Sequence, residues 1–408
     1  MIDFPMANYV PLLIALCLTW LLLRPPIRHS QFWRATVTPL ASIIGSGFLI
    51  IAPLLAKIGG SLAPWFMLAI ILVAYAIGEI IRFNIRYAER LFLDDTASLQ
   101  LRVTERFSNM ALSIAYIISI AFYIRLLASF VLNAFGVNSE VEGQILTTIV
   151  LLFIGVTGWR WGLHMLERLE VYSVTIKLAI IGSLLVVLFH YDFSHGFTNG
   201  AFEPEHLSIA ERLRMLAGML LVVQGFETSR YLGKEYSSQI RIQSMRFAQW
   251  LSAGIYLAFV FMITPILYLL EPGTFDETAI IYLVNYVAII LPFMLVGAAI
   301  MSQFSAAIGD TLGAGGLVEE ETQQRLPTAR AYLVITGLAI TLVWFADVFE
   351  IVTLASRAFA VYYLAQTFVA LQLISKITSY KQRLGYLALF GTTALLLVGV
   401  VIFAIPVG

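Results

Sequence analysis

Charged residues are scarce in this 408-residue chain, because Asp, Glu, Lys and Arg together make up only 12% of it. An ordinary soluble domain carries about 25% charged residues and roughly 45–50% apolar residues. Hydrophobic residues make up 60% of this chain, and its mean hydropathy is +0.88. The composition therefore excludes a soluble globular protein and predicts a chain that crosses a membrane several times.

Cysteine is almost absent, and neither sign of charge dominates. Cys17 is the only cysteine, which excludes an intramolecular disulfide and a metal site built from thiolates. The 25 basic residues balance 25 acidic residues, so no basic surface favours nucleic acid as a partner. The expected partners are the lipid bilayer, a small-molecule substrate and, with it, H⁺.

Catalytic motifs are also missing. The sequence has no phosphate-binding loop ending in Lys-Ser/Thr, no HExxH and no nucleophile elbow. Asp94 and Asp95 lack a second acidic cluster that would complete an aspartate-rich transferase site. His190, His195 and His206 lie near acidic residues of one predicted loop, but their irregular spacing favours a solvated surface over a metal site. We therefore expect no enzyme activity, no cofactor and no metal.

Twelve apolar segments are long enough to cross a bilayer, which takes about 20 residues of helix. The first of them is expected to be a retained helix, because no basic residue precedes it and no cleavage site follows it. The connections contain Gly, Pro and charged residues, and none is long enough for a soluble domain. The expected segments are residues 7–23, 36–57, 63–89, 108–135, 143–159, 171–190, 212–232, 247–270, 279–311, 329–346, 349–375 and 385–405.

Lys and Arg gather in alternate connections, which predicts the orientation because positively charged loops stay in the cytoplasm. With the connection at 24–35 inside, the inner connections hold most Lys and Arg residues, and the outer ones hold mainly Asp and Glu. Both termini are then predicted outside, in a multi-pass protein of the cell membrane, which is the inner membrane in a bacterium.

Two glycines interrupt the second segment. Residues 41–55 read ASIIGSGFLIIAPLL, in which Gly45 and Gly47 flank Ser46 at the depth of the bilayer centre. Glycine weakens a helix and lets other groups approach the backbone. An isolated pattern of this kind serves helix packing more often than ligand binding.

A second interruption makes ligand binding a stronger alternative to helix packing. Gln224, Gly225 and Glu227 lie inside the seventh apolar segment, and an ionisable residue at that depth is a functional candidate. The two interruptions are 180 residues apart, as are Lys177 and Arg357, and five predicted helices begin at each interruption. Paired interrupted helices in two halves indicate a secondary transporter with an inverted repeat.

Three stretches resemble the amino acid/polyamine/organocation (APC) superfamily of transporters. IIGSGFLIIAPLL is similar to the glycine-rich first core helix, and QGFE at 224–227 is similar to the sixth. MSQFSAAIGDTLGAGGLVEE at 301–320 resembles the eighth, which ends in a Gly-Leu turn. The second core helix lacks the usual P-x-x-G-G stretch, and a helix at 7–23 precedes the ten core helices, so the resemblance implies an outlying branch.

The resemblance implies an all-α polytopic membrane protein with twelve transmembrane helices. Its LeuT-like fold would contain a five-plus-five inverted repeat with discontinuous first and sixth core helices. The expected divisions are an extra N-terminal helix and loop (1–35), the first repeat (36–190), an outer loop (191–210), the inverted second repeat (211–376) and a C-terminal helix (377–408).

The resemblance also implies a substrate site at the interruptions. Free N–H groups where a helix begins attract a carboxylate, so those of Ser46, Gly47 and Phe48 would hold the substrate carboxylate. Nearby carbonyl groups would take the amino group, and an aromatic residue would either cover the substrate or serve ordinary packing. The implied residues are Ser42, Ile43, Gly45, Ser46, Gly47, Phe48, Gln224, Gly225 and Phe226.

Lys177 has two alternative roles. Sodium-coupled relatives of this fold hold a cation between the first and eighth core helices, and the resemblance implies that the ammonium group of Lys177 occupies that space. Burial would favour release of its proton during the transport cycle. Lys177 is also only six residues inside its helix, within reach of the interface by snorkelling. The first alternative predicts transport without Na⁺, by proton coupling or exchange.

Other charged residues inside the predicted helices are candidates for coupling or gating. Glu227 is either a coupling group or a structural partner of Arg125 or Arg357. Pairing is the favoured alternative, because an unpaired buried carboxylate would be protonated. Glu79, on the second core helix, completes this set.

The sequence thus predicts a secondary active transporter that moves a small amino acid or related amine by alternating access. A carrier for another small organic or inorganic ion is the first alternative, because Arg125 and Arg357 favour an anion. A membrane-embedded enzyme and a non-transporting sensor are the alternatives from other classes.

Overall fold

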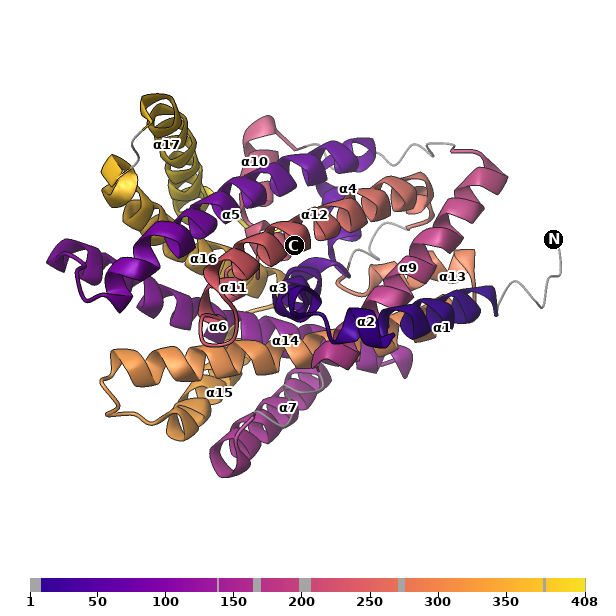
Figure 1. Ribbon diagram of the computed structural model, residues 1–408. Coiled ribbons are helices and arrows are strands. Elements are labelled where there is room, and N and C mark those ends of the chain that lie inside the picture. Colours follow the sequence, from indigo (N-terminus) through magenta and orange to yellow (C-terminus); the bar gives the residue numbers. More distant parts are fainter. Residues whose placement is uncertain are drawn as a thin grey trace.

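The computed structural model describes residues 9–137, 139–163, 170–197, 207–270, 276–376 and 379–407, which form helices and turns and contain no strand (Figure 1). Four short 3₁₀ helices, η1 (Gly60–Leu62), η2 (Leu220–Val223), η3 (Thr264–Leu269) and η4 (Ile374–Lys376), accompany the α-helices. The α-helices are α1 (Val10–Leu22), α2 (Pro25–Arg28), α3 (Gln31–Gly47), α4 (Ile51–Gly59), α5 (Ala63–Leu93), α6 (Leu99–Ala134), α7 (Glu140–Trp161), α9 (Glu170–His195), α10 (Ile209–Ala217), α11 (Thr228–Tyr231), α12 (Ser238–Ile263), α13 (Ala279–Val287), α14 (Leu291–Glu321), α15 (Thr328–Phe345), α16 (Val348–Leu373) and α17 (Tyr380–Phe403).

Nine helical stretches in the described part of the chain are long and apolar enough to cross a membrane, so the chain is a multi-pass membrane protein. Four of the twelve predicted helices are short or divided, including the one at 279–311. Helix α1 has 13 residues, α3 has 17, and the predicted segment 212–232 is divided into α10, η2 and α11. The count of twelve stays a prediction.

Serine residues begin many of the long helices. Their hydroxyl oxygens accept hydrogen bonds from backbone N–H groups of the first turn. These N–H groups have no partner within the helix, and apolar side chains offer them no acceptor. Ser208 forms a reciprocal capping box with Glu211, and Asp347 forms another with Glu350. The serines with such a bond are Ser30, Ser98, Ser139, Ser208 and Ser237.

The predicted helix at 279–311 is divided in the structure, and its predicted end is wrong. The chain turns between α13 and α14 because Ala288 is extended, with φ −161° and ψ 136°. Helix α14 then continues to Glu321, so the predicted Gly-Leu turn is helical. A Cβ at Gly315 would lie 3.0 Å from Cδ1 of Tyr332 on α15, so the glycine serves close packing of two helices.

Helix α6 lies at the centre of the molecule and packs along both α14 and α16. Helix α1 packs against α9, α15 against α7, and α17 against α16, with α1 and α17 on opposite sides of the molecule (Figure 1). Helix α12 packs against α3 and α5. This arrangement encloses the end of α3 between α6, α12 and α14.

Candidate functional site

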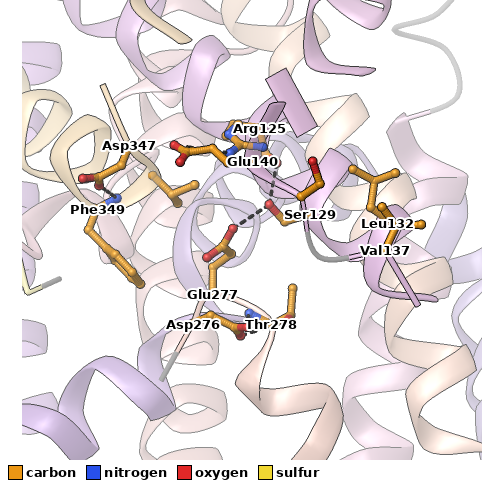
Figure 2. A pocket seen from close by; sticks show the side chains of 12 residues that line it. Arg125, Ser129, Leu132, Val137, Glu140, Asp276, Glu277, Thr278, Asp347 and Phe349 are labelled. Carbon is orange, nitrogen blue, oxygen red and sulfur yellow. Dashed lines mark hydrogen bonds and ion pairs between the residues drawn. The ribbon is translucent and has the colours of Figure 1, made fainter. Parts of the chain in front are cut away.

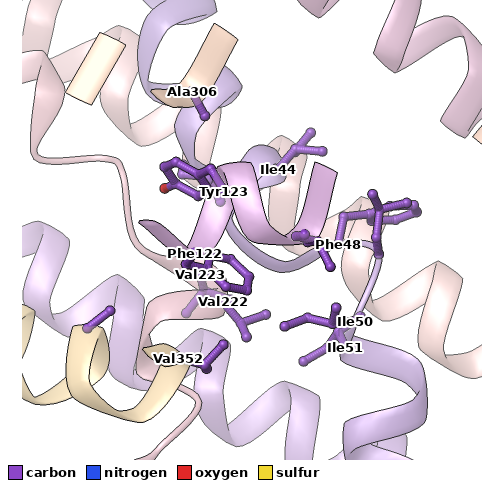
Figure 3. Packing of buried hydrophobic residues seen from close by; sticks show 14 of the residues in the cluster. Ile44, Phe48, Ile50, Ile51, Phe122, Tyr123, Val222, Val223, Ala306 and Val352 are labelled. Atoms are coloured by element: carbon purple, nitrogen blue, oxygen red, sulfur yellow. The ribbon is translucent and has the colours of Figure 1, made fainter. Parts of the chain in front are cut away.

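The two helix interruptions lie against each other in the protein core. Helix α3 ends at Gly47 and α4 begins at Ile51, while the chain around Gly225 connects η2 to α11. A Cβ at Gly47 would lie 2.6 Å from Cα of Val222. Figure 3 shows Val222 in the same cluster of packed residues as Phe48 and Ile50. A Cβ at Gly225, whose φ is +115°, would lie 2.8 Å from the backbone nitrogen of Ile43. The two glycines therefore permit direct contact between the interruptions.

The first interruption comes later than the sequence predicted. Gly45, Ser46 and Gly47 form the last turn of α3, and the non-helical residues are 48–50. Within the last turn of a helix the free groups are carbonyls, because the N–H groups bond to the preceding turn. The N–H groups left free at this interruption therefore belong to the first turn of α4, and the carboxylate seat at Ser46, Gly47 and Phe48 stays a prediction.

Carbonyl groups at the end of α3 are bonded to side chains from other helices. Gln303 of α14 donates its Nε2 to the Gly45 carbonyl at 2.9 Å. The Tyr256 hydroxyl of α12 lies 2.9 Å from both the Ile43 and Val222 carbonyl oxygens, so it bridges the two interruptions. Tyr256 was missed in the sequence, because a tyrosine in an apolar helix carries no distinctive signal.

Lys177 of α9 points into the protein core. Its side chain is 3% exposed, and its Nζ donates to the Ala41 carbonyl at 2.9 Å and to the Ser302 hydroxyl at 3.1 Å. Ala41 belongs to α3 and Ser302 to α14. The ammonium group therefore lies between these two helices, buried within the protein.

The second interruption is bonded to α6 and α16. Gln224 donates its Nε2 to the Tyr123 hydroxyl at 3.0 Å. Phe226 stacks on Tyr363 with ring centroids 5.4 Å apart. Glu227 accepts at one oxygen, Oε2, from the Gly225 N–H at 2.9 Å and the Tyr363 hydroxyl at 2.7 Å. The carboxylate thus holds the backbone of its own interruption.

The favoured pairing of Glu227 with Arg125 or Arg357 is wrong. Arg125 lies 3.9 Å from Glu140, and Arg357 donates to the carbonyl of Ala404 near the C-terminus. Successive residues of an α-helix are about 100° apart, so Arg125 points away from the interruption that Tyr123, two residues earlier, contacts. Arg357 precedes Tyr363 by six residues, about 9 Å along α16.

Arg125 instead lines a pocket of about 260 Å³. Figure 2 shows Arg125 beside Glu140, with the Ser129 hydroxyl donating to Glu277 at 2.6 Å. Asp276 and Asp347 also line this pocket, so its lining contains four carboxyl groups and one guanidinium. The bare backbone of Gly143 lets the guanidinium lie against α7. The charge of this pocket therefore suits a cationic group more than an anion.

Glu79 lies away from the interruptions. It pairs with Arg82 at 2.9 Å and lies 3.8 Å from Arg246. A separate set of ion pairs joins α6 to α11 and α5 to α12. Arg230 of α11 pairs with Glu105 at 2.8 Å and Arg241 with Glu89 at 2.6 Å.

Replacing Arg230 by alanine is expected to lower the free energy of unfolding by about 3–5 kcal/mol, because the change leaves Glu105 as an uncompensated charge. Arg230 is only 7% exposed and also donates to Gln366. Thermal unfolding in detergent measures the effect. Arg106→Ala is the control, because Arg106 is 54% exposed and pairs with Glu321 at the surface. Equal shifts in Tm would contradict a stabilising role for the buried pair.

Metal binding finds no support in the described residues, where no three His, Cys, Asp or Glu side chains cluster as ligands would. His206, the third member of the histidine group, lies outside the described residues.

A carboxyl group that the sequence analysis missed lies near the interruptions. Asp310 of α14 is 3% exposed and accepts a hydrogen bond from the Ser119 hydroxyl of α6. An aspartate inside an apolar helix is itself a functional signal. In the sequence this signal is obscured by the small residues that surround Asp310 in the stretch at 301–320.

Comparison with known proteins decides the family. A family model described as an APC superfamily transporter matches residues 25–404. The chain belongs to the APC superfamily. It is also 47% identical over 351 residues to an uncharacterized protein of Aquifex aeolicus (strain VF5), covering 85% of this chain and 86% of that protein. The predicted resemblance is confirmed.

Proposed function

We propose that this APC transporter moves a small amino acid or related amine across the cell membrane by alternating access and without Na⁺. The observation that carries the proposal is the position of Lys177. Its ammonium group lies between α3 and α14, bonded to the Ala41 carbonyl and the Ser302 hydroxyl. A positive charge already fixed there repels a sodium ion and replaces its charge. Transport is then driven by protons or by exchange.

The helix ends at the interruptions support a substrate that carries one positive and one negative charge. The end of α3 presents carbonyl groups and the start of α4 presents N–H groups, so opposite partial charges face each other across residues 48–50. An amino acid carries an ammonium group and a carboxylate a few bonds apart. Separation of the contact between Gly47 and Val222 would open space for such a molecule between the two interruptions.

The same proposal includes a LeuT-like arrangement of ten core helices in two inverted repeats of five. The interrupted helices are the first and the sixth of these ten. It also keeps both termini outside and the division of the chain at residues 36, 191, 211 and 377. An anion carrier receives less support, because Arg125 and Arg357 bond away from the interruptions.

A thermal-shift screen tests the proposed function. The detergent-purified protein is heated with each of the twenty amino acids, with polyamines and with small carboxylates, in Na⁺ or in choline. A ligand that binds only the folded protein stabilises it by about 2.7 kcal/mol at a hundred times its Kd. We expect one class of amino acid to raise Tm equally in both salts. Stabilisation that requires Na⁺, or that only non-amine anions produce, would overturn the proposal.

A further inference from the structure

Helices α5, α10 and α17 border an apolar groove of about 650 Å³, which we call the α10–α17 groove. Leu213 and Leu216 of α10 form one wall, and Leu396 and Phe403 of α17 form the other. The groove continues to Leu220 of η2. It therefore lies against the part of the chain that leads into the second interruption.

Small residues make the α10–α17 groove hollow. Ala69 of α5, Ala217 of α10 and Gly399 of α17 all line it. A Cβ at Gly399 would have no side chain or neighbouring segment of the described residues within 4 Å. A larger side chain at this position would therefore enter the open space of the groove.

Helix α10 has little protein around it. None of its nine residues is buried by the described part of the chain, although six of them are apolar. On the walls of the groove, Leu213 is 61% exposed and Leu396 is 54% exposed. Apolar side chains of a membrane protein ordinarily face lipid, so their exposure does not by itself identify an occupant. The charge in the groove does.

Arg214 alone is charged among the described residues that line the groove. Its Nε donates to the Phe403 carbonyl at 3.0 Å, and its own carbonyl accepts from the Ile405 N–H at 3.1 Å. Neither terminal nitrogen, Nη1 or Nη2, forms a hydrogen bond or ion pair within the described residues. Glu211, which interacts electrostatically with Arg214, accepts at Oε2 from Ser208 in the capping box. The guanidinium is therefore held in place with two donors left for a ligand.

Arg214 lies at the level of the lipid headgroups. Helix α17 has 24 residues, about 36 Å at 1.5 Å per residue, which exceeds the hydrocarbon core of about 30 Å. Phe403 at its end therefore lies at one surface of the membrane, and Arg214 is bonded to it. Leu395, also in the lining, precedes Phe403 by eight residues, about 12 Å. The groove thus extends from a cation at the surface through most of one leaflet.

We propose that the α10–α17 groove binds one anionic phospholipid, with an acyl chain between the two helices and its phosphate on Nη1 and Nη2 of Arg214. A guanidinium presents parallel N–H donors that match two phosphate oxygens. A zwitterionic headgroup adds an ammonium group, for which the described lining has no carboxyl acceptor. A headgroup with net negative charge, such as that of phosphatidylglycerol, therefore fits the groove.

A lipid in this groove would supply the packing that α10 does not receive from the described protein. It would stabilise the helix that leads into the second interruption, at a place distinct from the proposed substrate site. The binding of the lipid goes beyond the proposed function and does not depend on it.

Native mass spectrometry of the intact protein tests the site, because it counts bound lipid molecules. The detergent-purified protein is titrated with phosphatidylglycerol or with phosphatidylcholine that has the same acyl chains. We expect one phosphatidylglycerol molecule to bind at least about tenfold more tightly than phosphatidylcholine, since hydrogen bonds between charged groups support a factor of this size. Equal binding of the two lipids would overturn the proposal, as would a second copy of the protein in place of the lipid.

Arg214→Gln tests the contact with the phosphate. Phosphatidylglycerol is expected to bind this variant at least about tenfold more weakly, with binding of phosphatidylcholine unchanged. Arg212→Gln is the matched control, because Arg212 belongs to the same helix, donates its Nε to the Leu207 carbonyl and does not line the groove. Equal weakening by the two variants would show that surface charge in general attracts the lipid, and would overturn the site.

Gly399→Leu fills the groove while keeping Arg214, so it protects the test against misfolding of Arg214→Gln. Binding of phosphatidylglycerol is again expected to weaken at least about tenfold, because the leucine takes the place of the acyl chain. Gly391→Leu is the matched control, since a Cβ at Gly391 also has open space and this residue does not line the groove. Wild-type affinity in Gly399→Leu would overturn the proposal. No amino acid is present in these titrations, so their outcome is independent of the thermal-shift screen.

Discussion

Replacing Lys177 by alanine is expected to abolish the Na⁺-independent binding of the amino acids that stabilise the wild type. The change removes the positive charge between α3 and α14. It also leaves the Ala41 carbonyl and the Ser302 hydroxyl without their buried donor, at a cost of about 1–3 kcal/mol for each group. A loss of about 2.7 kcal/mol corresponds to a 100-fold higher Kd, and we expect at least this effect.

The measurement is the ligand-dependent Tm shift of the variant, with and without Na⁺. Lys381→Ala is the matched control, because Lys381 is exposed at the start of α17. If Lys177→Ala binds amino acids only when Na⁺ is present, the position that the ammonium group left is a cation site. Wild-type binding by Lys177→Ala in choline would instead contradict the role of the ammonium group.

Alanine at Gly47 is expected to force the two interruptions apart and to destabilise the protein by about 1–3 kcal/mol or more, as overpacking of a core does. The added methyl group would lie 2.6 Å from Cα and 2.7 Å from Cβ of Val222. Neither atom can move without the backbone of η2. We therefore expect a lower Tm together with loss of the Tm shift by amino acids.

Gly45→Ala provides the matched control for Gly47→Ala. The same methyl group at Gly45 would meet Cβ of Ala306 at 3.4 Å and the Ser302 hydroxyl at 3.5 Å, which are near ordinary contact distances. Thermal unfolding of the two variants in the same detergent is the test. Equal destabilisation at the two positions would contradict a specific contact between Gly47 and Val222.

The features that could be predicted from the sequence are those that depend only on the order of residues along the chain. A glycine beside a carboxyl group within an apolar run is visible without coordinates, so the interruption at 224–227 was predicted in its observed place. Membership of the APC superfamily followed from the same stretches and their order. Lys177 was conspicuous as a charge within an apolar helix, and the resemblance supplied the helices that it faces.

The sequence could not show how the helices are rotated about their axes. The partner of Glu227 depends on which side of α6 and α16 faces the interruption. Arg125 and Arg357 lie in these two helices, but Tyr123 and Tyr363 are the residues that face the interruption. The end of α3 was misplaced for a related reason. Glycines permit a break, but here they serve contact between segments 180 residues apart in the chain.

In the proposed transport cycle, the fixed position of Lys177 determines which gradients can drive accumulation of the substrate. A sodium ion that crosses with a substrate moves an elementary charge, worth about 2.3 kcal/mol per 100 mV of membrane potential. The ammonium group of Lys177 is covalently part of α9 and is not released with the substrate. A zwitterionic amino acid that crosses alone therefore transfers no net charge. The membrane potential then contributes to its accumulation only through protons that cross in the same cycle.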